Sequence, residues 1–260
     1  MTVSHWWDDC AGFFGRNYIL GDASQEGYLP EKKECLEERT RRESEGVIGL
    51  LQLETGARIL DLPCGYGRHS LALSQRGFAV TGLDINTEHL EVARKNAAYL
   101  SFLKRDMRCI GEDLHERFDA VLNMFYSFGF FGEDENKKTM MQFYLALRKG
   151  GSLLLHTDVS PEMILAGHYR LHEKRKINDH LTLLITEQYD ALTKRMNGSW
   201  RLMNEQKETN LTPYSVRIYS AEEFEQLARD VGFSVISFFG SFEGTPFTTQ
   251  SHELIMIARK

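Results

Sequence analysis

Residues 58–70 read Arg-Ile-Leu-Asp-Leu-Pro-Cys-Gly-Tyr-Gly-Arg-His-Ser, and this stretch does most to predict the fold. An apolar run ends in an acidic residue, two glycines follow at a spacing of two, and a helical pattern begins at once. This order is typical of a buried strand, a tight turn and a helix start. Because glycine has no side chain, Gly65 and Gly67 would let bare backbone approach a ligand at the turn.

A second strand-like segment, residues 78–84, follows the turn and ends in Asp84. At the end of the second strand of a strand–helix–strand unit, a carboxylate suits a ribose, because it can accept hydrogen bonds from both hydroxyls of the diol. The whole order of strand, turn, helix, strand and acid is more specific than the glycine pair, which many turns contain. These residues therefore predict a ligand that carries a ribose.

The turn lacks the features of sites for phosphorylated nucleotides. A dinucleotide fingerprint places a third glycine three residues after the second, and this chain has Ser70 there. The Gly-x-x-x-x-Gly-Lys-Ser/Thr loop of nucleoside triphosphate sites does not occur in the sequence. A nucleoside ligand without phosphates remains, and S-adenosylmethionine fits that description.

The chain resembles the class I S-adenosylmethionine-dependent methyltransferases. More narrowly, it is similar to a bacterial small-molecule group with a Pro-Cys-Gly-x-Gly-Arg-His-Ser turn. The similar segments are the turn itself, the leader Glu-Arg-Thr-Arg-Arg-Glu at 38–43, and residues 105–108, 123–131 and 242–247. The resemblance is weakest over residues 160–215. It implies methyl transfer from S-adenosylmethionine to nitrogen or oxygen of a small molecule.

Strands and helices alternate from about residue 58, which predicts an α/β fold with a parallel sheet and helices on both faces. Strands are predicted at 58–62, 78–84, 100–105, 118–124, 151–157, 233–239 and 252–259, and helices at 68–76, 87–98, 134–148 and from Ser220. Residues 149–151, Lys-Gly-Gly, are expected to end the third of these helices. The resemblance implies a Rossmann-like seven-stranded sheet in the order 3-2-1-4-5-7-6, with the last strand antiparallel.

Residues 168–218 break this alternation, because short strand-like runs there are joined by turns. They predict an inserted small antiparallel sheet that lies over the site as a lid and selects the acceptor. We therefore expect a helical cap at 1–56, a core at 57–160 and 219–260, and a lid at 161–218. A charged helix is predicted within the cap at about residues 31–53.

The resemblance assigns the donor contacts to the ends of the first four strands. Cys64, Gly65 and Gly67 would face the methionine part, and Asp84 would bind the ribose hydroxyls. Ile85 would pack on the adenine, Asp106 would accept from the adenine amino group, and Met107 would offer its backbone to the ring. Asn123 and Met124 would lie near the sulfonium. Asp61 is expected to organise the turn from beneath. Tyr18, Arg41 and Arg42 could close over the methionine carboxylate, since an arginine can bind a carboxylate with two hydrogen bonds. For Asp106 a turn-capping role stays open, and for Arg41 a surface role does.

The acceptor would lie near the aromatic run that follows the fourth strand. Aromatic stripes are usually core, but glycines at 129 and 132 suggest that part of this run forms a pocket wall. The candidates for catalysis are Asn123 and Tyr126, and those for substrate binding are Tyr126, Phe128, Tyr214, Arg217, Tyr219 and Phe247. The sequence shows no pattern of nucleophile, base and orienting group, and no spacing of metal ligands.

Composition narrows the classes of partner. A net charge of −6 argues against a large nucleic-acid footprint, and no apolar run is long enough to cross a bilayer. Four cysteines without paired spacing are read as reduced thiols in a cytoplasmic protein. We expect a small-molecule acceptor, no nucleic acid, no membrane and no metal, and keep a homodimer open because strand edges invite pairing.

Two alternatives remain at this stage. One is a methyltransferase that acts on RNA or protein, although the acidic balance and the lack of an added nucleic-acid domain weigh against RNA. The other is a module that binds the donor without catalysis. Release of S-adenosylhomocysteine in the presence of an acceptor would distinguish a catalyst from such a module.

Overall fold

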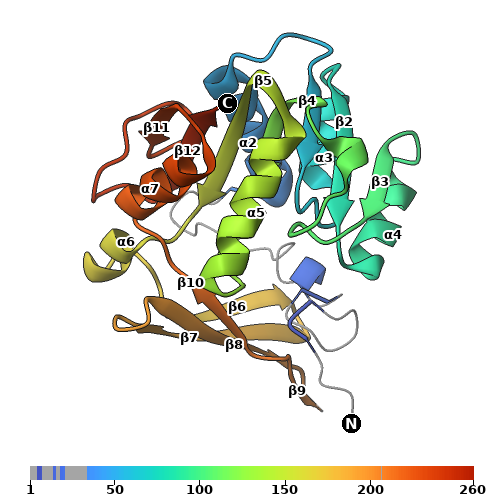
Figure 1. The fold of residues 1–260 in the computed structure, drawn as a ribbon. Helices are drawn as coiled ribbons and strands as arrows, with labels where there is room; N and C mark the ends of the chain where they lie inside the picture. The colour runs from blue at the N-terminus through green and yellow to red at the C-terminus, as the bar shows by residue number, and fades with distance from the viewer. Residues whose placement is uncertain (1–4, 8–13, 16–17, 21–33, 206) are drawn as a thin grey trace.

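The computed structural model describes residues 5–7, 14–15, 18–20, 34–205 and 207–260. Its two parts are a large α/β core and a smaller sheet below it in Figure 1. The core contains α2 (Leu36–Leu51), β1 (Arg58–Asp61), α3 (Arg68–Ser74), β2 (Ala79–Asp84), α4 (Thr87–Asn96), β3 (Ser101–Lys104), η1 (Glu112–Leu114), β4 (Phe118–Asn123), α5 (Glu133–Ala146), β5 (Leu147–Thr157), α7 (Ala221–Val231), β11 (Val235–Phe239) and β12 (Leu254–Arg259). The fold class predicted from the sequence is confirmed.

The seven strands of the core pair in the order β11-β12-β5-β4-β1-β2-β3. Strands β1 to β5 are parallel to one another, and β12 runs antiparallel to both β5 and β11. In chain order this is 3-2-1-4-5-7-6, as predicted. The order reverses between β1 and β4, so their carboxyl ends lie on either side of the crevice where open α/β sheets bind ligands.

Side chains that alternate along the strands supply two apolar cores, one on each face of the sheet. Leu60 of β1 packs in the cluster that includes Phe143 of α5 and Phe224 of α7. Ile59, the preceding residue, packs in the cluster that includes Val47 of α2. The sheet is therefore covered on both faces, which explains why its central strands are apolar throughout.

The second sheet follows α6 (Pro161–Leu165) and is antiparallel. It contains β6 (His172–Asn178), β7 (Leu181–Asp190), β8 (Arg195–Met203), β9 (Glu208–Asn210) and β10 (Tyr214–Arg217), in the order β10-β8-β7-β6 with β9 beside β8. Strand β9 was not predicted. Figure 1 shows this sheet across the end of α5, with the described N-terminal residues beside it. We call β6 to β10 the lid sheet.

Two predicted boundaries are wrong. The helix expected to continue to residue 148 ends at Ala146, and Leu147 already pairs with Phe118 of β4. The Gly150 amide donates to the Lys260 carbonyl, and the Lys260 amide donates to the Gly151 carbonyl. The glycine pair therefore belongs to β5, not to a helix cap. The charged helix α2 begins at Leu36, later than predicted, and residues 31–33 lie outside the described part.

In the described ranges, no helix is both long enough and apolar enough to span a bilayer. The three cysteines within those ranges, Cys35, Cys64 and Cys109, are free thiols.

Candidate functional site

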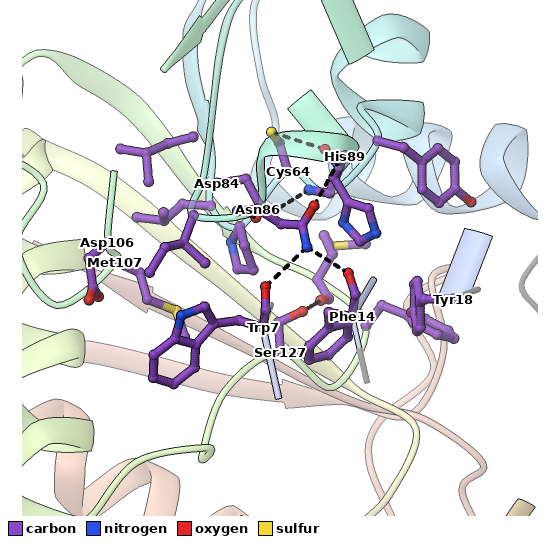
Figure 2. Close-up of a pocket in the computed structure, with 18 of the residues that line it drawn as sticks. Trp7, Phe14, Tyr18, Cys64, Asp84, Asn86, His89, Asp106, Met107 and Ser127 are labelled. Carbon is purple, nitrogen blue, oxygen red and sulfur yellow. Dashed lines mark hydrogen bonds between the residues drawn. The ribbon is translucent and has the colours of Figure 1, made fainter. Parts of the chain in front are cut away.

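A pocket lies at the carboxyl ends of β1, β2 and β4, where the strand order reverses. The turn after β1, the loops after β2, β3 and β4, and described residues of the N-terminal segment form its walls. Figure 2 shows the side chains of Asp84, Asn86 and Met107 on one side, with Trp7, Phe14 and Tyr18 across from them. The pocket thus combines a polar strand-end edge with an aromatic wall.

The two glycines of the turn serve different purposes. Gly65 lines the pocket with a φ of 54°, and the nearest atom to a Cβ placed there would be His89 Nδ1 at 3.9 Å. Gly67 does not line the pocket. A Cβ on Gly67 would lie 2.9 Å from the Ala93 Cβ and 3.2 Å from the Phe102 ring, and its φ is 82°. Gly65 therefore keeps backbone open to a ligand, whereas Gly67 allows α4 and β3 to pack closely.

Asp84 lies at the end of β2 with only 6% of its surface exposed, and it lines the pocket beside Ile85. Its Oδ2 accepts a hydrogen bond from the Gly65 amide and its Oδ1 accepts one from the Asn86 amide, both at 2.8 Å. These bonds tie the turn after β1 to the end of β2. Burial raises the pKa of the Asp84 carboxyl above its ordinary value.

Asp61 and Asn123 lie beneath the pocket instead of lining it. Asp61 is 1% exposed and its Oδ2 accepts from the Ser70 hydroxyl at 2.6 Å, while burial raises its pKa to about 7. Asn123 is fully buried and donates from Nδ2 to the Leu62 carbonyl at 2.9 Å. The expected supporting place of Asp61 agrees with this geometry. Asn123, predicted near the reacting group, braces the strand ends and does not reach the pocket.

Cys64, Asp106, Met107 and Met124 line the pocket, as their sequence positions suggested. Burial raises the pKa of the Cys64 thiol, which suits a packing role better than that of a nucleophile. Asp106 accepts from the Arg108 guanidinium at 2.6 Å. Partial burial opposes ionisation of Asp106, but the bonds from Arg108 hold its pKa below the ordinary value.

The N-terminal aromatic wall is held by Asn86, which sequence reasoning missed. Its amide nitrogen donates to the carbonyls of Trp7 at 3.1 Å and Phe14 at 2.9 Å, as the dashed lines in Figure 2 show. Its amide oxygen accepts from the His89 backbone at 2.9 Å and caps α4. An asparagine before a predicted helix signals a cap, but no sequence signal marked its tether to the distant segment.

Tyr18 lines the pocket, but Arg41 does not. The Arg41 side chain is 61% exposed and pairs with Glu45, one turn along α2, at 3.3 Å. Arg42 is also engaged elsewhere, with Glu34 and Glu253. The prediction that Arg41 closes over a carboxylate therefore fails in this arrangement, because α2 turns this residue toward solvent.

The helix α2 contributes through Glu43 instead. Glu43 is 1% exposed, and its Oε2 accepts from the Arg68 guanidinium and lies 2.8 Å from His69 Nε2. Burial opposes ionisation, yet Arg68 and Arg39 hold the Glu43 pKa well below its usual range. Burial lowers the pKa of His69 to about 4. Arg68 and His69 line the pocket, so the leader segment braces the turn through buried charge.

The chain after β4 is strained at Phe125 and Tyr126, whose φ values are 60° and 59°. His156 Nδ1 accepts from the Phe125 amide and the His156 carbonyl accepts from the Tyr126 amide, both at 3.2 Å. The Arg39 guanidinium lies 4.4 Å from the centre of the Phe125 ring. Phe125 thus enters the pocket, whereas Tyr126, the predicted catalytic residue, lies against a second, smaller cavity.

The other predicted substrate residues lie outside the pocket. Phe128 packs in the core against Phe143 and Phe224, and Phe247 packs beside the same core. Arg217 pairs with Glu133 at 2.9 Å and Glu223 at 2.6 Å, Tyr219 bonds Asn136 and Glu133, and Tyr214 donates to Glu187. Arg217 and Tyr219 therefore join the lid sheet to α5 and α7. From the predicted aromatic run Phe131 lines the pocket, and so does Phe125, which was not predicted.

Within the described residues, no group of histidine, cysteine and acidic side chains could hold a metal ion.

Similarities to known proteins agree with this geometry. A family model described as a methyltransferase domain matches residues 59–151. The glycine/sarcosine N-methyltransferase of Aphanothece halophytica is 28% identical over 242 residues, covering 90% of this chain and 89% of that protein.

Two solved structures share the fold at low identity. The CcbJ methyltransferase of Streptomyces caelestis has a TM-score of 0.74 at 19% identity, covering 85% of this chain and 88% of that one. CalS10 of Micromonospora echinaspora, an amino pentose methyltransferase, has a TM-score of 0.65 at 20% identity, covering 85% and 92%. The family match thus shows similarity to a methyltransferase domain at residues 59–151, and the two solved structures share the seven-stranded fold.

Proposed function

We propose that this protein is a methyltransferase that uses S-adenosylmethionine to methylate an amine nitrogen of a small molecule, as a member of the bacterial group that its turn motif resembles. The pocket at the strand-order reversal carries this proposal, because its polar edge suits a ribose and its aromatic wall suits the adenine and the thioether carbons. The similarity to a glycine/sarcosine N-methyltransferase over nine tenths of the chain favours nitrogen over oxygen.

The residues present fit this donor. Gly65 leaves backbone uncovered beside the pocket, and Asp84 keeps a buried carboxylate whose oxygens can accept further hydrogen bonds from a diol. In the proposal Cys64 and Gly65 face the methionine part, Asp84 binds the ribose, and Ile85 packs on adenine. Asp106 and Met107 lie at the adenine edge, Met124 lies near the sulfur, and Tyr18 covers the methionine end.

The protein's own task is positioning and exclusion of water. S-adenosylmethionine supplies a methyl group on a positively charged sulfur; the acceptor lone pair forms the new nitrogen–carbon bond, and the carbon–sulfur pair stays on sulfur. The aromatic wall, held by Asn86 through Trp7 and Phe14, would shield one side of the pocket from solvent. Phe125, fixed by His156 and Arg39, shapes the end of the pocket beside β4. An amine that is already neutral needs no base to attack.

The test is release of S-adenosylhomocysteine when the protein and S-adenosylmethionine meet small amines, small alcohols, RNA and protein acceptors in separate reactions. The proposal expects release above background with small amines. Release only with RNA or protein would mean that the acceptor is one of these macromolecules and not a small amine. Donor binding without release in every reaction would favour a non-catalytic module.

A further inference from the structure

A second polar centre lies on the inner face of the lid sheet, around Glu187 of β7. Glu187 is 4% exposed, and its Oε2 accepts a hydrogen bond from the Tyr169 hydroxyl at 2.7 Å. Its Oε1 accepts from the Tyr214 hydroxyl. Among the described residues, no cationic side chain pairs with this carboxylate. A carboxylate buried so deeply is normally paired with a cation or neutralised by a proton.

The sheet is built to bring Tyr214 to this carboxylate. Tyr214 of β10, Gly198 of β8 and Glu187 of β7 stand opposite one another in a row across three strands. A Cβ on Gly198 would lie 2.2 Å from Cζ of the Tyr214 ring. The tyrosine ring therefore crosses the middle strand over the bare glycine and reaches the acid on the far strand.

The surroundings of Glu187 add negative charge rather than neutralise it. Asp158, which follows β5, and Glu173 of β6 both repel Glu187. Burial raises the pKa of Asp158 to about 6 and that of Glu187 above its ordinary value. Glu173 itself pairs with Arg175 at 2.8 Å.

The phenols and cations around Glu187 do not supply a counter-ion. Tyr126, from the strained segment after β4, lies close enough to Tyr169 to affect its ionisation. Arg195 lines the neighbouring groove, but its guanidinium donates to the carbonyls of Phe131 and Ser215. Arg39 acts on Asp158, not on Glu187. In the part of the chain that the structure describes, the centre therefore has acceptors and phenols but no cation.

This centre opens to a groove that adjoins the donor pocket. Glu187 and Tyr214 line the groove together with Trp6 and Phe130. Trp6 also lines the donor pocket, and its ring centre lies 4.5 Å from that of Phe130. Phe130 in turn lies 6.2 Å from the Tyr214 ring. An aromatic wall that contains Trp6 and Phe130 thus lies between the donor pocket and the groove.

We propose that Glu187, oriented by Tyr169 and Tyr214, binds a cationic amine group of the methyl acceptor, distinct from the neutral nitrogen that receives the methyl group. This inference rests on the proposed function and specifies the chemical class of its substrate. An ammonium group carries a positive charge and only donates hydrogen bonds. It therefore suits an ionised carboxylate, which only accepts hydrogen bonds and which has no cationic partner among the described residues. A hydroxyl in the same place would leave the charge unpaired. We assign recognition to Glu187, and no proton transfer.

The experiment compares matched acceptor pairs that keep one amine as the nucleophile and differ at a second group, amine or hydroxyl: 1,2-diaminoethane and 2-aminoethanol, 1,4-diaminobutane and 4-amino-1-butanol, lysine and 6-hydroxynorleucine. S-adenosylhomocysteine release is measured for the wild type, Glu187→Gln and Tyr214→Phe. The control is Glu208→Gln, an exposed charge change in the same lid sheet. Calorimetry with S-adenosylhomocysteine and thermal melting accompany each variant.

We expect more release with at least one diamine than with its amino alcohol partner. Glu187→Gln should lower kcat/KM for that diamine by roughly 30-fold or more, because a charged hydrogen bond is lost, and should leave S-adenosylhomocysteine affinity unchanged. Tyr214→Phe, which removes one hydroxyl and keeps the ring, should raise KM by a smaller factor. Glu208→Gln should match the wild type.

Three results would overturn the assignment. They are an amino alcohol that outperforms its diamine partner, a folded Glu187→Gln variant with wild-type kcat/KM, and no release with any amine from a protein that binds S-adenosylhomocysteine. Failure to bind S-adenosylhomocysteine at all would instead contradict the proposed function. If Glu187→Gln does not fold, the Tyr214→Phe result decides.

Discussion

The donor pocket and the Glu187 centre of the lid sheet are built in different ways. The donor pocket uses backbone that one strand–turn–helix segment brings together: Gly65 is bare, and its amide is held by Asp84 at the end of the adjacent strand. The Glu187 centre uses side chains from β7 and β10, which meet across the bare Gly198 of β8, and from Tyr169 in the loop before these strands. A fixed ligand can be bound by the first kind of site, whereas the second can change through single substitutions.

The first prediction tests the contribution of Asp84 to the donor pocket. Asp84→Ala should weaken S-adenosylhomocysteine binding by about 3 kcal/mol, because it removes a buried acceptor and frees the Gly65 and Asn86 amides. Calorimetry measures the change. Asp84→Asn keeps one acceptor and should lose less. Unchanged affinity in a folded Asp84→Ala protein would remove Asp84 from the site.

A second prediction separates strain from contact at the turn. Gly67→Ala should lower the free energy of unfolding by about 2 to 3 kcal/mol, since it combines a positive φ with a Cβ contact of 2.9 Å. Gly56→Ala is the matched control, because its φ is 86° and nothing lies within 4 Å. Denaturant unfolding should show a loss of about 1 kcal/mol for that control. Equal losses of unfolding free energy in the two variants would mean that the contact of the new Cβ with α4 adds no cost to that of the positive φ.

The third prediction concerns the attachment of the lid sheet. Arg217→Ala should cost about 2 kcal/mol of stability, since it leaves Glu133 and Glu223 without a buried partner. Donor affinity should stay within twofold, while acceptor KM rises. Lys194→Ala, which removes a half-exposed partner of Glu223, should cost less than about 0.5 kcal/mol. A large loss of donor affinity in Arg217→Ala would show that the lid holds the donor pocket as well.

The smallest predicted effect is a pH dependence at His156. Burial lowers the folded-state pKa of His156 to about 3, below the usual 6.5 of the unfolded chain. Protonation therefore favours the unfolded state, and stability is lost as pH falls below about 6.5. Between pH 7 and pH 5.5 this loss is about 1 kcal/mol. His156→Asn keeps an acceptor near the Phe125 amide and should remove that part of the loss.

The pH series compares the same two proteins by denaturant unfolding at each pH. His69, with a pKa near 4, adds a loss of the same sign, and Asp61, with a pKa near 7, adds the opposite sign. Both are present in wild type and variant, so the difference isolates His156. Identical pH slopes in the two proteins would contradict a buried neutral His156.

The core was predictable because its signals are local. The alternation of apolar runs with helical patterns placed every strand of the large sheet, and the acid after the second strand marked the place of Asp84. The family resemblance implied the places of Cys64, Ile85 and Met107, and all three line the pocket. Such positions depend on the order of elements along the chain, which sequence periodicity reports directly.

Positions that depend on distant partners were not predictable. Asn86 tethers residues far away in the chain, and Arg41 lies on the wrong side of α2 for the predicted contact. The Phe125–Tyr126 strain turns one ring into the pocket and the other away from it. The row of Tyr214, Gly198 and Glu187 exists only through strand register, which a sequence does not state.

Calorimetric titration of the wild-type protein with S-adenosylhomocysteine, and separately with NAD, tests the central claim most directly. The donor-site account predicts one S-adenosylhomocysteine per chain, with a Kd in the micromolar range or tighter, roughly −8 kcal/mol, and no heat with NAD. Saturable binding of NAD, with none of S-adenosylhomocysteine, would contradict it.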